Sequence, residues 1–125
     1  MNGLPASTHG QGAHWRLSWP VVSLLRAAQG PLRRDEILRR LKSNGELQSA
    51  FPAVWAADPE SSSGLPRVLS FVLTHTRHAG LTEAAATRGA HQLTPLGLSA
   101  SEDDVLVLTY EAKAASRRSA GRHTA

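Results

Sequence analysis

The spacing of hydrophobic residues predicts two short amphipathic helices near the start of the chain. Apolar side chains recur at intervals of three and four over residues 20–28, and this run ends at Gly30. Residues 32–44 repeat the pattern, with acidic residues in the first turn, basic residues later and Asn44-Gly45 as a stop signal. Such periodicity buries one side of a helix, and this order of charges suits the helix dipole. The fold is therefore expected to begin near Trp15 with two helices.

A third amphipathic helix is expected over about residues 66–79, with Gly80 at its end. On a helical wheel its core face is mostly apolar and consists of Leu65, Val68, Leu69, Val72, Thr76 and Ala79, with Leu73 at the margin. The opposite face mixes basic, hydroxyl and aromatic side chains: Arg67, Ser70, Phe71, Thr74, Arg77 and His78. On that face Phe71 would leave apolar area in water, which indicates a contact with another part of the molecule or with a partner.

Residues 81–94 are expected to form a β-hairpin. Two short stretches, 81–85 and 90–94, flank a turn at Thr87-Arg88-Gly89. The order helix, helix, helix, hairpin is that of a winged helix-turn-helix, in which the third helix enters the major groove of DNA and the hairpin is the wing. The sequence therefore predicts a mainly α fold with a small β-hairpin.

The other segments carry weaker signals. Residues 45–66 contain prolines and a serine-rich run, which indicates an insertion with a partial helix between the second and third helices. Residues 94–98 are expected to close the core. The expected organisation is a disordered segment at 1–14, the winged-helix domain at 15–98, a C-terminal helix at 99–116 and a basic flexible tail at 117–125.

The C-terminal helix is expected to begin with Ser101 and three acidic residues. Three apolar residues at helical spacing would face inward: Val105, Leu108 and Ala112. The stretch "VLVLTY" also suits a strand. Leu106 and Tyr110 are apolar residues of this helix outside its inner side. Two alternatives stay open for them: packing within the chain, or pairing with a second copy in a homodimer.

Composition limits the classes of function. The 125 residues suffice for one domain, and the net charge of +4 with a pI near 10.7 suits an anionic partner. The absence of cysteine excludes a disulfide framework and thiol catalysis. No apolar run approaches the roughly 20 residues of a membrane span, and the start of the chain lacks an export signal. We expect a cytoplasmic protein without a membrane partner, associated with the nucleoid if it binds DNA.

The segment "VLSFVLTHTRHAGL", followed by a short hairpin and "HQLTPLGL", resembles the amino-terminal domain of Mrr-type restriction proteins. In that family a helix with an Ala-Gly-Leu-like stop precedes a hairpin that ends in a Thr-x-x-Gly turn, here Ala79-Gly80-Leu81 and Thr94-Pro95-Leu96-Gly97. The resemblance covers residues 17–98 and implies a DNA-binding winged helix that directs a separate nuclease domain in full-length restriction proteins. The 125 residues depart from the pattern because they include no nuclease domain; Glu111-Ala112-Lys113 echoes only half of a nuclease site.

The predicted contacts to double-stranded DNA combine base-reading and phosphate-binding positions. Arg67 lies at the start of the third helix, where side chains reach base edges most easily, and Ser70, Phe71 and Thr74 follow along the groove. Phosphate contacts are expected from Arg77, His78, Arg33 and Arg34. Arg88 at the tip of the wing is expected to reach either the minor groove or the neighbouring backbone. These residues suggest a regulator, or a recognition module of a restriction or defence system. The alternative is that these polar and basic helix faces are simply exposed to solvent and contact no ligand.

The sequence predicts no catalytic or metal site. His75, His78 and His91 are of a type that binds zinc, but nothing in their spacing makes them converge. No motif places a nucleophile beside a base. We therefore expect no enzyme activity, no cofactor and no small-molecule substrate. The alternative function is protein–protein assembly, with Phe71, Trp55 and the last helix as the interface.

Overall fold

The computed structural model describes the backbone of residues 11–124 and the side chains of residues 14–116. The fold is mainly helical with a small three-stranded antiparallel sheet. The elements are, in chain order, the 3-10 helix η1 (Gln11–Leu17), α1 (Ser18–Ala28), β1 (Leu32–Arg33), α2 (Arg34–Lys42), α3 (Gly45–Ala50), α4 (Pro52–Ala56), α5 (Leu65–His78), β2 (Thr82–Ala84), β3 (Ala90–Leu93), α6 (Pro95–Ser99) and α7 (Glu102–Thr124).

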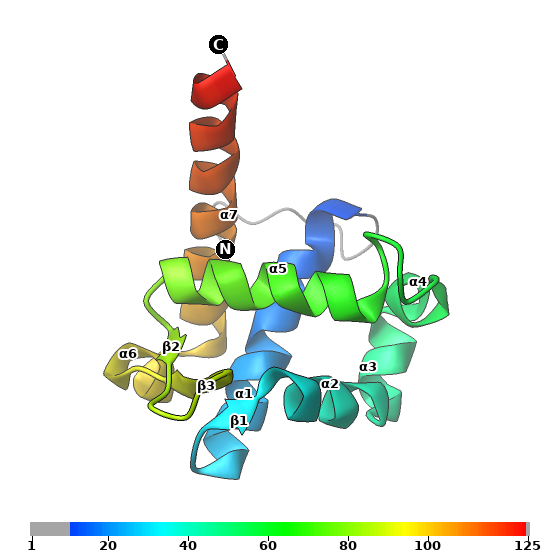
Figure 1. The fold of residues 1–125 in the computed structure, drawn as a ribbon, viewed down its shortest axis with the longest axis vertical. Coiled ribbons are helices and arrows are strands. Elements are labelled where there is room, and N and C mark those ends of the chain that lie inside the picture. Colours follow the sequence, from blue (N-terminus) through cyan, green and yellow to red (C-terminus); the bar gives the residue numbers. More distant parts are fainter. Residues whose placement is uncertain (1–10, 125) are drawn as a thin grey trace.

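Helix α5 runs across the middle of the molecule, with α1 and α7 behind it, α2 below it and the sheet near its C-terminal end (Figure 1). Its predicted core face is confirmed, because the apolar residues of that face and Thr76 are buried in the structure: Leu65, Val68, Leu69, Val72 and Leu73. They meet buried residues of the first two helices, among them Val21, Leu25, Ile37 and Leu41. The apolar stripe of α5 therefore joins α1, α2 and the insertion in one core, and Val105 of α7 packs with Val22 and Leu81 in a second cluster.

The hairpin is confirmed, and the structure adds a strand that the sequence did not predict. Strand β1 pairs with β3 and gives the sheet order β1-β3-β2, with Leu32 opposite His91. Residues 32 and 33 are therefore extended, and the second helix begins at Arg34 rather than at Leu32. Their extended conformation depends on pairing with β3. A strand of two residues is too short to show a periodic pattern in the sequence. The turn of the hairpin contains Gly89 at a φ of +79°, a conformation that favours glycine.

A buried pair of hydroxyl groups links α5 to the hairpin. The oxygen atoms of Thr76 and Thr82 lie 2.9 Å apart, and Thr76 also donates to the carbonyl of Leu73. This explains why the polar Thr76 occupies the core face of α5, since the hydroxyls of both threonines have a hydrogen-bond partner. The link fixes the sheet relative to the helix.

The insertion at 45–66 contains two short helices, α3 and α4, rather than one partial helix. Asn44 begins the first of them, because its side chain accepts a hydrogen bond from the Leu47 amide. Trp55 packs against the core, and its indole nitrogen donates to the carbonyl of Lys42 at 3.3 Å. These contacts tie the insertion to the end of α2.

Both ends of the chain differ from the expectation. Residues 1–10 lie outside the described part, while residues 11–14 belong to η1, so the prediction of disorder is wrong for these four. Helix α7 starts at Glu102, where the Asp104 amide donates to the hydroxyl of Ser101 at 3.1 Å, and its backbone continues through Thr124. The strand alternative for "VLVLTY" is therefore wrong, and the segment predicted as a flexible tail is helical as far as residue 124.

The outer apolar residues of α7 pack within the chain. Leu106 is buried, and the ring of Tyr110 lies edge-on to Trp15 with 5.1 Å between centroids. Of the two alternatives for these side chains, the intramolecular one describes the structure.

Within residues 11–124, no helix combines the length and the apolar character needed to cross a bilayer.

The segment 94–98 reaches the core through backbone rather than through its leucines, which corrects the expectation. Leu96 and Leu98 are exposed, while Gly97 is buried against the carbonyl of Leu81. The guanidinium group of Arg26 donates to the carbonyl oxygens of Gly97 and Ala100 at 2.6 to 3.0 Å. Arginine from α1 thereby holds α6 and the start of α7 in place.

The close approach at Gly97 yields a prediction. A Cβ atom there would lie 2.1 Å from the carbonyl oxygen of Leu81, so the backbone would have to shift. We expect Gly97→Ala to lower the free energy of unfolding by about 1–3 kcal/mol, the usual cost of overpacking. Gly45→Ala is the matched control, because a Cβ atom at Gly45 has no neighbour within 4 Å. Chemical denaturation of both variants measures the difference, and equal stabilities would contradict this account of α6.

Candidate nucleic-acid interface

The polar face of α5 is on the surface, as the sequence predicted. Arg67, Phe71, Arg77 and His78 are exposed, whereas Ser70 and Thr74 are half-buried. We call these six residues the polar face of α5. It lies opposite the apolar stripe that forms the core, so the packing of the helix determines which side faces outward.

Arg34 is less available to a ligand than the sequence suggested. Its Nε donates to the hydroxyl of Ser70 at 3.1 Å, and its Nη2 donates to the carbonyl of Pro66 at 2.5 Å. The first turn of α2 is thereby attached to the first turns of α5. A guanidinium group has five N–H donors, so Arg34 keeps some for another partner. The structure brings these two predicted site residues together, but as partners of each other.

Two hydroxyl groups of the polar face are also used within the helix. Ser70 donates to the carbonyl of Pro66 at 3.3 Å, and Thr74 donates to the carbonyl of Ser70 at 3.0 Å. A hydroxyl can still accept a hydrogen bond while it donates one, so base contacts at these positions are limited to acceptor roles unless the side chains rotate.

His91 joins the basic residues on one flank of α5, which the sequence did not predict. Burial lowers the pKa of His91 from its ordinary value, and the positive charges of Arg77 and Arg34 lower it further. Three elements, α2, α5 and β3, therefore bring their cationic or ionisable groups close together. The sequence could not show this arrangement, because it depends on the pairing of Leu32 with His91. That pairing places β3 directly beside the start of α2.

Arg33 and Arg88 extend this basic flank toward the sheet. Both are exposed: Arg33 pairs with Ala90 across the ladder, and Arg88 lies in the turn between β2 and β3. Glu83 on β2 opposes them in charge, although its carboxylate accepts a hydrogen bond from the side chain of Gln92 at 2.8 Å. The positive charge of the sheet is therefore concentrated at its turn and at β1.

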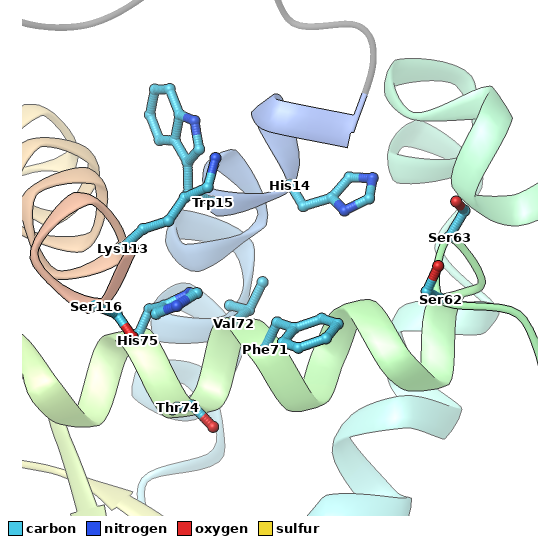
Figure 2. A pocket seen from close by; sticks show the side chains of 10 residues that line it. All are labelled: His14, Trp15, Ser62, Ser63, Phe71, Val72, Thr74, His75, Lys113 and Ser116. Atoms are coloured by element: carbon cyan, nitrogen blue, oxygen red, sulfur yellow. The ribbon is translucent and has the colours of Figure 1, made fainter. Parts of the chain in front are cut away.

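The opposite flank of α5 contains a pocket of about 540 Å³ (Figure 2). Phe71 and His75 line it from α5, Trp15 from η1 and Lys113 from α7. Phe71 is 52% exposed and forms part of the wall. Burial lowers the pKa of His75, and the neighbouring His78 and Lys113 add to this effect. The two flanks of the same helix thus differ in shape and chemistry.

Among the described residues, no group of three or more histidine, aspartate or glutamate side chains is arranged to hold a metal ion. His75 and His91 belong to opposite flanks of α5, one at the pocket and the other beside Arg77. His78 is exposed near the end of the helix.

Comparison of the chain with protein-family models, with curated proteins and with solved structures finds no significant match. The resemblance to Mrr-type restriction proteins therefore stays a prediction from short motifs.

The basic cluster can be checked by titration without any ligand. We expect the pKa of His91 to lie below 6.5 and to rise in Arg77→Met, because Arg77 has the larger effect of the two arginines that lower this pKa. Because the unfolded chain binds this proton more readily, the His91 contribution to stability declines as pH falls below about 6.5 and is lost as pH falls through the lower pKa of the folded state. Histidine NMR titration measures the pKa. Arg67→Met is the control on the same face, and an equal change in both variants would contradict the proposed neighbourhood of His91.

Proposed function

We propose that the chain is a winged helix-turn-helix domain that binds duplex DNA, with α5 in the major groove and the β2–β3 turn beside the backbone or the minor groove. The order α1, β1, α2, α5, β2, β3 and the pairing of β1 with β3 support this fold assignment. The single observation that carries the function is the outward polar face of α5, with exposed arginines near both of its ends.

The dimensions of α5 suit this role. Its 14 residues correspond to a helix about 21 Å long, and a major groove about 12 Å wide admits an α-helix. Arg67 lies in the first turn, where a guanidinium can make two hydrogen bonds to guanine. Arg77 lies in the last turn, beside the sheet, and is better placed for a phosphate. Phe71 between them offers an apolar surface to a thymine methyl group or to a modified base.

The charges around α5 favour a moderate, salt-sensitive affinity. Exposed arginines at positions 33, 67, 77 and 88 come from β1, α5 and the hairpin turn. Asp35 and Glu83 lie near the same elements and weaken the field. With four or five phosphate contacts, the logarithm of the binding constant should fall with a slope of about −4 against the logarithm of the salt concentration. We propose recognition without chemistry, in a regulator or in a restriction or defence system.

The assembly alternative has less support from the contacts. It required Trp55 and the last helix as exposed apolar surface. Trp55 packs against the core, Leu106 is buried and Tyr110 contacts Trp15. Among the apolar residues named for that interface, Phe71 alone is exposed.

DNA binding can be tested with a double variant, Arg67→Ala with Arg77→Ala. We expect wild type to bind random duplex DNA in fluorescence polarisation, and the variant to bind at least tenfold more weakly with a salt slope shallower by about 1–2, because two contacts are lost. Comparison of methylated with unmethylated duplexes shows whether a modified base is read.

The control removes the same charge elsewhere. Arg39 and Arg40 on α2 both pair with Glu36, and Arg40 lies at a shallow hollow beside Trp19 and Leu24 of α1. Arg39→Ala with Arg40→Ala should therefore weaken DNA binding much less. Equal losses in the two double variants would point to binding by net charge alone, and absence of binding at low salt would refute the proposal.

A further inference from the structure

The pocket beside α5 is built from four segments that are distant in the sequence. Its walls come from η1, the loop before α5, α5 itself and α7. Figure 2 shows His75 and Lys113 toward one end, Phe71 along the middle and Ser62 and Ser63 at the other end. A volume of about 540 Å³ is within the range of small-molecule sites. The pocket is large enough for a compact organic ligand.

The walls combine an apolar middle with polar ends. The ring of Phe71 and the side chain of Val72 supply the apolar surface, and the hydroxyls of Ser62 and Ser63 supply hydrogen-bonding groups at one end. Phe71 is held on a helix whose other side is fully packed, so the ring occupies a defined place. A flat aromatic ligand would cover the exposed part of Phe71 and remove its apolar area from water.

The charged end of the pocket is positive. None of the described residues that line it is acidic, whereas Lys113 brings an ammonium group from α7. Burial lowers the pKa of both His14 and His75, and Lys113 lowers each further, so its charge acts on both sides of the pocket. The lowered pKa values favour the neutral form of both imidazoles, and a neutral imidazole still offers one N–H donor. One fixed cation with two neutral donors suits a monoanion.

We propose that this pocket binds a small aromatic carboxylate, with its ring against Phe71 and its carboxylate beside Lys113 and His75. A phosphate dianion would need more cations than these walls provide. Lys113 has another interaction in the chain, but an ammonium group has three N–H donors and can add a carboxylate to it. The ligand class follows from an aromatic surface along the middle of the cavity and a cation at one end of it.

Ligand binding would also affect α5. Phe71 and Thr74 line the pocket and belong to the polar face of α5, so a bound carboxylate would compete with DNA for the same side chains. It would also repel DNA, because both are negatively charged. This part of the inference rests on the proposed function. The binding of the ligand itself does not, because it can be measured without DNA.

The first experiment uses 2-naphthoate as the probe and neutral 2-naphthamide as its matched control, with the full chain. NMR resolves the indole N–H signals of the three tryptophans. Trp15 lines the pocket, whereas Trp19 and Trp55 lie elsewhere. We expect naphthoate to shift the Trp15 signal in a saturable way and to leave the other two unchanged. Naphthamide should shift the same signal only at higher concentration.

Variants separate the charge from the apolar contact. Lys113→Gln should weaken naphthoate about tenfold without affecting naphthamide, because a charge-assisted hydrogen bond is lost, and Lys113→Arg should restore most of the affinity. Phe71→Ala should weaken both compounds by a similar factor. Lys42→Gln is the control, since this exposed lysine on α2 removes the same charge away from the pocket.

Three results would overturn the inference: no saturable shift of Trp15, equal shifts of all three indoles, or equal affinities for naphthoate and naphthamide.

DNA competition is then measured with wild type and Lys113→Gln, and naphthoate should displace DNA more effectively from wild type. A chain that binds naphthoate at Trp15 but shows no binding to DNA would refute the proposed function while supporting the pocket. Binding of both without competition would overturn the coupling.

Discussion

The burial of the apolar stripe of α5 is the interaction on which the rest of the structure depends. Its leucines and valines form the common core with α1, α2 and the insertion, and each fully buried side chain of this kind contributes about 1.5–3 kcal/mol. The helix is amphipathic, so this burial also fixes its rotation about its own axis. The polar face of α5 is outward because the opposite face has no alternative to the core.

Polar contacts then decide what surrounds that face. The pairing of β1 with β3 brings the start of α2 beside the hairpin, and Arg34 attaches it to α5 through Ser70 and Pro66. The threonine pair at 76 and 82 sets the sheet against the other end of the helix. The basic flank around Arg77 and His91 is a product of these links. Arg34 thus serves first as a structural residue, and any contact with phosphate is additional.

The other flank of α5 depends on the two ends of the described chain. Trp15 of η1 and Tyr110 of α7 pack on each other, and the segments on either side of them form walls of the pocket. Phe71 is shared between the pocket and the polar face. Since Phe71 belongs to both surfaces, the ligands proposed for them would compete for this side chain, and such a coupling would be reciprocal.

The sequence by itself determined the amphipathic helices, the hairpin and the polar face of α5, because these follow from repeats over neighbouring residues. Only the tertiary structure decided that residues 32 and 33 form a strand, that Leu106 and Tyr110 pack inward, and that the histidines divide between two flanks. It also showed that Arg26 holds α6 by its carbonyl groups. Local periodicity encodes which side of an element is apolar, whereas its neighbours depend on contacts between residues far apart in the chain.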